Sequence, residues 1–488
     1  CAGLRKLRTG QDGVAQAGFA FCATTTSRFS RCDAIAWPRL RVPIDLGVRW
    51  CPQRRAKKDC AHQLRTMSCL SAPRDDAAHL VVVGASFAGL QVAKDAAGRL
   101  RVTVVDPKDY FEFTPSLHTA LGAARDAASL LKPLDGSLVP GARFVRGAAV
   151  GADETRVSVR TERGVETVAY DYLVIACGCS YPAPIREAVD AADQTRARRL
   201  ARIASAEATL GGAGAVLVVG GGAVGVEVAA ELATSGPRSV TLATAAPELL
   251  PDMPAETRGA ARVALRALGV EMLFETRCDR VAPAADPAGG AFELKSAGGV
   301  ESRTFDACVR CFGARPQTAW LDGFCARDAR GFVVVDDRGR CAVGDAENVW
   351  AAGDCAAKPD AQRLASYAHF EGEYVAGCIL AAAAGSAQPE PYAPPPRLVA
   401  LSFGPRDGAF AYDAKPVPVP GALVPWLKTV IEHWFIRLLP MPYAVLRWLP
   451  DVGGGAAARG WGRATAANAT DAAGASAPLL ARSAAAAG

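Results

Sequence analysis

The sequence lacks, over most of its length, the charge bias that marks nucleic-acid-binding proteins. Residues 1–66 hold 13 Lys or Arg and four Asp, whereas the whole 488-residue chain has a net charge of +6. The first segment alone therefore carries +9, which leaves the other 422 residues with −3. Because a nearly neutral body offers no electrostatic footprint for DNA or RNA, we predict no nucleic-acid partner.

A regular cysteine framework is also absent. Six of the 15 cysteines fall before residue 70 and the others are scattered, which predicts mostly free thiols in a reducing compartment. Cys308 and Cys311 have the spacing of a redox motif, but on a strand their side chains would face opposite sides. No second pair follows at the spacing of a zinc site, so we predict no metal.

The first 66 residues contain no Glu and are rich in Arg, Ser and Thr, as organelle transit peptides are. The sequence starts at Cys1, and Met67 lies twelve residues before His79, which leads into the first predicted strand, so Met67 is an alternative start. Both interpretations predict no folded domain in residues 1–78. A transit peptide would direct the protein to a mitochondrion or plastid; otherwise we predict a cytoplasmic protein, peripheral on membranes.

What the sequence does contain, at residues 79–106, is the layout of a dinucleotide-binding βαβ unit. Leu80–Val83 predicts a buried strand, followed by a glycine-containing turn, a helix over residues 90–100 and a second strand that ends at Asp106. In such a unit the turn lets backbone N–H groups approach a pyrophosphate, and the carboxylate binds ribose hydroxyls. Ser86 replaces the usual middle glycine. The turn consists of Gly84, Ala85, Ser86, Phe87, Ala88 and Gly89.

A second unit of the same kind starts with the predicted strand 215–219. Its three glycines, Gly220, Gly222 and Gly225, all stand between strand and helix, which makes the motif specific. Its second strand runs into Thr244, where NAD-selective units carry Asp or Glu, so the choice between NADH and NADPH is open. Glu227, in the first helical turn, either stabilises the positive helix end or approaches the nicotinamide.

Later strands return the chain to the first unit. The β-rich stretch 142–176 ends at Cys177-Gly178, and the stretch 292–307 is followed by a similar turn at Gly313. A further strand ends at Gly353-Asp354, an acidic turn of the kind that binds ligands at the carboxyl edge of α/β sheets. Together the two units and the late turn predict one composite site.

These patterns predict an α/β fold. We expect two Rossmann-like dinucleotide-binding domains, the second inserted in the first, and a small C-terminal α+β segment. The predicted boundaries are 79–200 and 325–387 for the first domain, 201–324 for the second, 388–452 for the C-terminal segment, and 453–488 for an Ala/Gly-rich tail without fold.

The chain resembles the two-dinucleotide-binding-domain flavoproteins of the pyridine nucleotide-disulfide oxidoreductase fold, and most of all the apoptosis-inducing-factor-like, ferroptosis-suppressor type of NAD(P)H:quinone oxidoreductase. The resemblance covers about residues 79–450 and includes the run Phe403–Gly408. One departure is that Thr119, beside His118, stands where the subfamily has a flavin-contacting Arg. The resemblance implies FAD binding by Gly84, Ala85, Ser86, Phe87, Ala88, Gly89, Asp106, Ala149, Cys177, Gly178, Gly353 and Asp354. It implies binding of NADH or NADPH by Gly220, Gly222, Gly225, Glu227 and Gly313.

Disulfide reductases of this fold carry a cysteine pair on the helix after the first glycine turn, and this chain has none there. The reduced flavin would therefore pass its electrons directly to an acceptor, with the cofactor supplying the chemistry and no side chain acting as nucleophile. Cys177, Cys179 and Cys355 leave sulfide oxidation as a minor alternative.

The acceptor is suggested by the tryptophan-rich segment Leu423–Leu449. Lys428, Glu432 and Arg437 interrupt its apolar residues too often for a membrane-spanning helix. An aromatic, basic and amphipathic segment suits a membrane surface, where a lipid quinone would be found. The alternative is a helix that packs on the core or on a second subunit, so a homodimer is open.

We therefore predict an FAD-dependent oxidoreductase that passes hydride from NAD(P)H to a quinone-like acceptor. Arg363 matches a Lys of the ferroptosis-suppressor branch and is either a charge in the acceptor pocket or a solvated residue. The alternatives are a soluble reductase of a small electron-carrier protein, a type II NADH dehydrogenase, and a redox sensor without useful turnover. Type II enzymes carry quinone-site glutamines where this chain has Ser366, Phe370 and Glu371.

Overall fold

The computed structural model describes residues 76–186, 194–282, 284, 287–344, 346–357, 363–412, 415–417 and 419–438, without the side chains of 433–438. All of these residues belong to the unit Cys69–Gly488. Residues 1–75 of the predicted leader, the Ala/Gly-rich tail and residues 439–449 of the tryptophan-rich segment lie outside the described residues.

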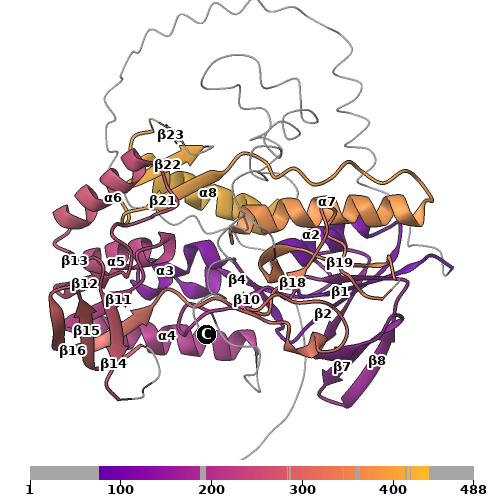
Figure 1. Cartoon of the computed structure of the whole chain (residues 1–488), viewed down its shortest axis with the longest axis horizontal. Coiled ribbons are helices and arrows are strands. Elements are labelled where there is room, and N and C mark those ends of the chain that lie inside the picture. Colours follow the sequence, from indigo (N-terminus) through magenta and orange to yellow (C-terminus); the bar gives the residue numbers. More distant parts are fainter. Residues whose placement is uncertain are drawn as a thin grey trace, which may run out of the picture. The chain divides into compact units, whose positions relative to one another are not determined.

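The first domain is built on a five-stranded parallel sheet in the order β19-β9-β1-β2-β5. Strands β19, β1 and β2 are labelled in Figure 1. In the central strand, β1, Leu80 and Val82 pack into one apolar cluster, and Val81 and Val83 pack into another on the opposite face of the sheet. An uninterrupted apolar run forms a strand here because both faces are covered. The strands are β1 (His79–Val83), β2 (Arg101–Asp106), β5 (Ala142–Arg146), β9 (Tyr172–Ile175) and β19 (Val349–Ala351).

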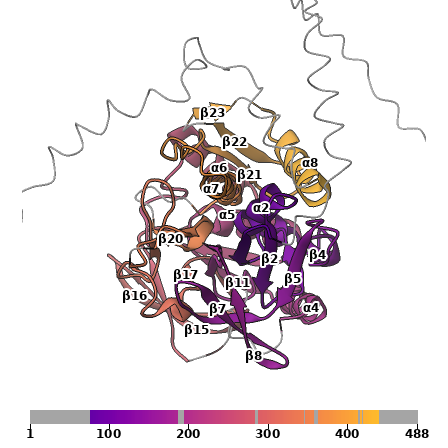
Figure 2. The same cartoon turned by 90° about the vertical axis from the view of Figure 1, so that its right-hand side faces the viewer.

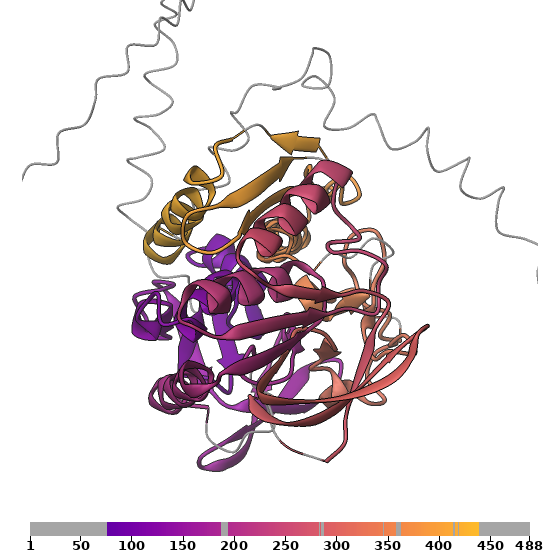
Figure 3. The same ribbon diagram turned by 90° about the vertical axis from the view of Figure 1, so that its left-hand side faces the viewer.

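The second domain has a six-stranded sheet in the order β13-β12-β11-β16-β15-β14. Its strands are among the magenta to red ribbons in Figure 3. Strands β13, β12, β11 and β16 are parallel neighbours, and β15 and β14 continue the sheet as antiparallel strands. All six fall in the sequence between β9 and β19 of the first sheet, so the second domain is inserted in the first, as predicted. The strands are β11 (Ala215–Val219), β12 (Ser239–Ala243), β13 (Glu271–Leu273), β14 (Arg277–Arg280), β15 (Ala288–Ser296) and β16 (Gly299–Arg310).

Helices α2 and α7 lie side by side against the first sheet (Figure 2). They approach closely because Gly372 of α7 has no side chain: a Cβ there would lie 2.5 Å from the Ala88 carbonyl oxygen. The helix predicted over residues 90–100 was misplaced, because α2 already starts at Phe87, within the glycine turn, and ends before Gly98, whose φ is +80°. The longer helices are α2 (Phe87–Ala96), α4 (Arg196–Gly212), α5 (Ala223–Thr234), α6 (Ala255–Ala267), α7 (Ala365–Ala383) and α8 (Leu423–Leu438).

The remaining elements are short and connect or cover the two sheets. They are β3 (Tyr110–Glu112), η1 (Thr114–Ser116), α3 (Leu117–Leu121), η2 (Ala127–Ser129), β4 (Leu131–Pro133), β6 (Ala148–Ala152), β7 (Arg156–Thr161), β8 (Gly164–Ala169), β10 (Cys179–Ser180), β17 (Arg315–Pro316), η3 (Ala319–Leu321), β18 (Val333–Val334), η4 (Gly353–Cys355), β20 (Ala356–Ala357), β21 (Leu398–Ser402), β22 (Gly408–Tyr412) and β23 (Lys415–Val417).

A buried ion pair fixes α4 to the first domain. The Arg199 guanidinium donates to both carboxylate oxygens of Glu112 at 2.9 and 2.8 Å, and it also donates to the carbonyl oxygen of Pro184 at 3.0 Å. Two parallel charge-assisted hydrogen bonds fix orientation as well as distance. The connection between the two domains is therefore held in one geometry at this point.

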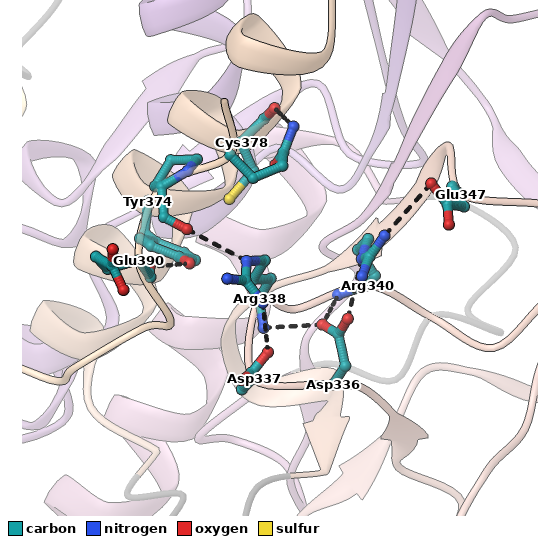
Figure 4. Close-up of polar contacts among 10 residues, drawn as sticks. Asp336, Asp337, Arg338, Arg340, Glu347, Tyr374, Cys378 and Glu390 are labelled. Carbon is teal, nitrogen blue, oxygen red and sulfur yellow. Dashed lines mark hydrogen bonds and ion pairs between the residues drawn. The ribbon is translucent and has the colours of Figure 1, made fainter. Parts of the chain in front are cut away.

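The proline-rich stretch 388–396, at the start of the predicted C-terminal segment, is held along its first half by Tyr374 of α7 and by the loop residues Asp337 and Arg338 (Figure 4). The Tyr374 hydroxyl donates to the Glu390 carbonyl oxygen at 2.6 Å, and Arg338 Nε donates to the Pro389 carbonyl oxygen at 3.2 Å. Tyr392 N–H donates to the Asp337 carbonyl oxygen at 2.9 Å. This stretch is therefore not a free tether, and it positions the C-terminal strands relative to the first domain.

Candidate active site

The first glycine turn brings the backbone close to the next strand of the sheet. Gly84 has a φ of +114°, and a Cβ there would lie 2.2 Å from the Ala176 carbonyl oxygen, so only glycine fits. Ala85 N–H donates to the Asp106 carboxylate at 2.6 Å, and Lys108 Nζ lies 2.9 Å from the same carboxylate. Turn and carboxylate are thus held together at the N-terminus of α2.

A small cavity of about 90 Å³ lies along this turn, at the carboxyl ends of β1, β2 and β9. Several residues predicted to bind the cofactor line it, which places the predicted adenosine and pyrophosphate contacts in one groove. Gly89 does not line it, but it permits the turn, because a Cβ there would lie 1.8 Å from the Gly84 carbonyl oxygen. The predicted residues in its walls are Gly84, Ala85, Ser86, Asp106, Ala149, Cys177 and Gly178.

A larger cavity of about 280 Å³ adjoins the first, and Ser86, Gly178 and Arg186 line both. Its walls come from the first glycine turn, from α5 of the second domain, from the late Gly-Asp turn and from α8. The structure therefore brings together Ser86 and Asp354 of the predicted composite site, which are 268 positions apart in the sequence. The predicted site residues in its walls are Ser86, Phe87, Ala88, Gly178, Glu227, Gly353, Asp354 and Arg363.

The second glycine turn joins β11 to α5 in the same way. A Cβ at Gly225 would lie 1.8 Å from the Gly220 carbonyl oxygen, which keeps this turn tight. Gly222 differs, because a Cβ there would meet no atom within 4 Å, and the same holds at Gly313 after β16. Open space over a glycine at a helix N-terminus suits a pyrophosphate, so the residues present fit a second dinucleotide.

The late acidic turn is held by a neighbouring carboxylate. Gly353 has a φ of +78°, and its N–H donates to Glu371 at 2.7 Å. Burial raises the pKa of Asp354, although Arg186, at 3.7 Å, and Arg363 oppose that rise. Glu371, which occupies the place of a type II glutamine, thus positions the turn.

Arg363 lies in the wall of the larger cavity rather than in open solvent. Its guanidinium stacks on the Phe332 ring, 4.1 Å from the centroid. A planar cation held flat against a ring is restricted in orientation, which suits recognition of a polar group on a ligand.

Glu227 is the centre of a buried polar network. Its carboxylate accepts hydrogen bonds from the backbone N–H and the hydroxyl of Ser402, both at 2.9 Å, and from Lys428 Nζ. His118 Nε2 lies 3.0 Å from the same hydroxyl. Burial favours the neutral acid, but Lys428 and His118 hold the pKa of Glu227 below its ordinary value, so the carboxylate is ionised.

The two neighbours of Glu227 have strongly shifted pKa values. Burial lowers the pKa of His118 to about 4, with Lys428 adding to the effect, so the imidazole is neutral at pH 7. Burial raises the pKa of Glu231, one helical turn further along α5, to about 7, and the Glu227 charge adds to the rise. Glu231, His118 and Lys428 also line a further cavity of about 270 Å³.

Sequence reasoning missed the part that Lys428 and Glu432 have in this network, because it assigned both to an interrupted, membrane-facing segment. In the structure Lys428 contacts Glu227, and the buried Glu432 accepts hydrogen bonds from Arg125 at 2.6 and 2.7 Å. Over residues 423–432 of α8, where the side chains are described, the exposed ones are apolar instead: Leu423 is 49% exposed and Trp426 63% exposed. The signal was available, since these charges are spaced at i and i+4 on one helix face.

No helix within the described ranges combines the length and the apolar character needed to cross a membrane. Helix α8 is described over 16 residues, and its inward charges take part in the network above. The prediction that this segment does not span is therefore consistent with the described part of it.

Comparison with known proteins agrees with this architecture. Residues 78–372, more than half of the chain, match the family model described as pyridine nucleotide-disulphide oxidoreductase. Oxidoreductase ptaL of Pestalotiopsis fici is 27% identical over 74% of this chain and 97% of its own length. Human ferroptosis suppressor protein 1 is 30% identical over 41% of this chain and 53% of its own length. The solved sulfide:quinone oxidoreductase of Aquifex aeolicus superposes with a TM-score of 0.62, at 17% identity, over 77% of this chain and 96% of its own.

The predicted fold class, the enzyme class and the two cofactors are confirmed by these matches. The assignment of FAD to the first glycine turn and the late acidic turn, and of NAD(P)H to the second glycine turn, stays a prediction, as do the roles of single residues. The protein is an NAD(P)H-dependent flavoprotein oxidoreductase, and the chain belongs to the pyridine nucleotide-disulphide oxidoreductase family.

Proposed function

We propose that this enzyme delivers the electrons of NAD(P)H, through FAD, to a quinone-like acceptor. The observation that carries the proposal is the larger cavity, where residues of both dinucleotide units and of α8 meet. Phe113, Leu117, Leu401 and Ile431 contribute apolar walls, and Arg363 contributes a fixed cation. A flat apolar acceptor with a polar carbonyl matches such a lining.

The thiols of the chain do not favour a dithiol or sulfide route. No cysteine lines the larger cavity within the described residues. Burial raises the pKa of Cys179 to about 12, so this sulfur is protonated at neutral pH and is a poor nucleophile. Cys177, which lines the smaller cavity, also has a raised pKa, caused mainly by its hydrogen bond with Cys355 and by burial.

Bound FAD would supply the redox chemistry, by accepting a hydride and returning two electrons. Reduction of a quinone by NAD(P)H also consumes one proton from water. Lys428 lines the larger cavity, and it also lines the neighbouring cavity that contains Glu231. The residues of the Glu227 network are therefore placed to keep a proton available next to the acceptor.

Two kinds of relative support the choice of acceptor. The chain shares its fold with an enzyme whose name includes quinone, the sulfide:quinone oxidoreductase of Aquifex aeolicus. It also shares sequence with human ferroptosis suppressor protein 1, the type that the sequence resembled.

The purified holoenzyme is expected to oxidise NADH or NADPH rapidly when a short-chain ubiquinone is present, and slowly without it. Steady-state absorbance at the nicotinamide band measures both rates.

The Arg363→Met variant should retain FAD but raise the KM for the quinone about tenfold, because the cavity loses its fixed cation. Arg330→Met is a matched control, since Arg330 contacts the same Phe332 ring but does not line the cavity. Rapid turnover with ferredoxin or rubredoxin but not with quinone would refute the proposal.

We further propose that the apolar outer face of α8, with Leu423 and Trp426, contacts a membrane surface from which a lipid quinone enters. The Trp426→Ser variant should bind liposomes of mixed phosphatidylcholine and phosphatidylglycerol at least fivefold more weakly in a co-sedimentation assay. Val263→Ser on α6 is the control, because Val263 is 70% exposed on another element. If Trp426→Ser binds vesicles like the wild type but dissociates a dimer, this face is a subunit interface instead. The compartment stays a prediction.

A further inference from the structure

The second dinucleotide unit lacks a carboxylate at the expected place, and the backbone defines that place. Gly84 N–H donates to the Val105 carbonyl oxygen at 2.8 Å, and Gly220 N–H donates to the Ala243 carbonyl oxygen at 2.8 Å. The residues that follow, Asp106 and Thr244, are therefore equivalent. Asp106 accepts a hydrogen bond from its glycine turn, whereas Thr244 offers only a hydroxyl, which accepts from Ala246 N–H at 3.2 Å.

The segment that follows the third strand is one residue longer in the second unit than in the first. Val105 pairs with Val145 in the first unit, and Ala243 pairs with Leu273 in the second. In the first unit the Asp106 carbonyl oxygen accepts from Gly147, two positions after Val145. In the second unit the Thr244 carbonyl oxygen accepts from Thr276, three positions after Leu273. The second unit therefore has an extra residue beside its ribose-binding position.

Glu275 lies at this insertion. Its φ is +48°, an uncommon conformation for a non-glycine residue, and its N–H donates to the Ala246 carbonyl oxygen at 3.0 Å. Its side chain is exposed. An extra residue in a strand redirects the side chain that it carries, and such insertions are frequent next to functional sites.

In the first unit, the residues after the third strand lie at the predicted cofactor cavity. Gly147, Ala148 and Ala149, which follow the third strand there, line the small cavity together with Asp106. By the same geometry, the residues after β13 lie along the adenosine side of the second unit.

We propose that Glu275 supplies the carboxylate that the end of β12 lacks, and thereby makes the enzyme selective for NADH. The carboxylate accepts the ribose 2′-hydroxyl of NADH, and it repels the 2′-phosphate of NADPH. This proposal rests on the NAD(P)H dependence of the enzyme and is independent of its acceptor.

Calorimetric titration of the FAD-loaded protein with NAD⁺ and NADP⁺ tests the proposal without turnover. The wild type should bind NAD⁺ at least tenfold more tightly than NADP⁺. Glu275→Gln should reduce that ratio below threefold, mainly through tighter NADP⁺ binding, and Glu275→Arg should invert it. Glu301→Gln is the matched control, because Glu301 is an exposed strand glutamate at the far end of β16. It should leave the ratio unchanged.

Glu275→Asn separates side-chain chemistry from backbone conformation, since Asn tolerates a positive φ. This variant should melt at or above the wild-type temperature and still lose the preference for NAD⁺. Equal affinities of the wild type for NAD⁺ and NADP⁺, or an unchanged ratio in both the Gln and Asn variants, would overturn the assignment.

Discussion

Replacing Ser86 with Leu is expected to give a folded protein that does not retain FAD. Ser86 has extended backbone angles, φ −125° and ψ −156°, which leucine adopts without strain, and its side chain makes no capping hydrogen bond. It lies in the walls of both cavities, at the N-terminus of α2. A larger apolar side chain would therefore fill the space next to the helix end where the pyrophosphate binds. The flavin-to-protein absorbance ratio after gel filtration should fall at least tenfold.

Ser86→Gly is the matched control, because it restores the glycine of the usual motif. This variant should retain FAD at the wild-type ratio, and the far-ultraviolet circular dichroism of both variants should equal that of the wild type. Stoichiometric FAD in a folded Ser86→Leu protein would show that the turn binds another group.

The two βαβ units were predictable because their signals are local. Each combines a buried apolar strand, a glycine turn and a helix within about 30 residues, and the hydrogen bonds of Gly84 and Gly220 repeat each other in register. The start of α2 was less predictable, since the pattern predicted a start at Leu90 and the helix begins at Phe87. A glycine turn whose residues already belong to the helix cannot be separated from it by hydrophobic periodicity alone.

The Glu227 network could not be predicted, because its partners come from three distant segments. Ser402 is 175 positions away in the sequence and Lys428 is 201 positions away. The sequence indicated an aromatic and basic segment, and both a membrane surface and a protein core satisfy that pattern. Only the tertiary structure shows that Lys428 and Glu432 of α8 face the protein, and that the exposed side chains over residues 423–432 are apolar.

Lys428→Met should weaken the attachment of α8 far more than the double variant Glu227→Gln/Lys428→Met. The side chains of Lys428 and Glu227 are only 12% and 9% exposed, so removing the cation leaves a buried carboxylate without its main partner. Breaking a buried pair in this way typically costs about 3–5 kcal/mol. The pKa of Glu227 should rise in the single variant, since burial then acts without the opposing ammonium.

A double-mutant cycle separates that cost from the loss of packing. The Gln side chain keeps an oxygen that accepts from Ser402, and Met keeps most of the Lys stem, so the double variant removes both charges with little change of shape. We expect a coupling energy of roughly 2–3 kcal/mol, measured as the opening free energy of residues 423–438 by native-state hydrogen exchange. Additive effects of the two substitutions would contradict a buried ion pair, and would show that α8 is held by apolar packing and the Arg125–Glu432 pair alone.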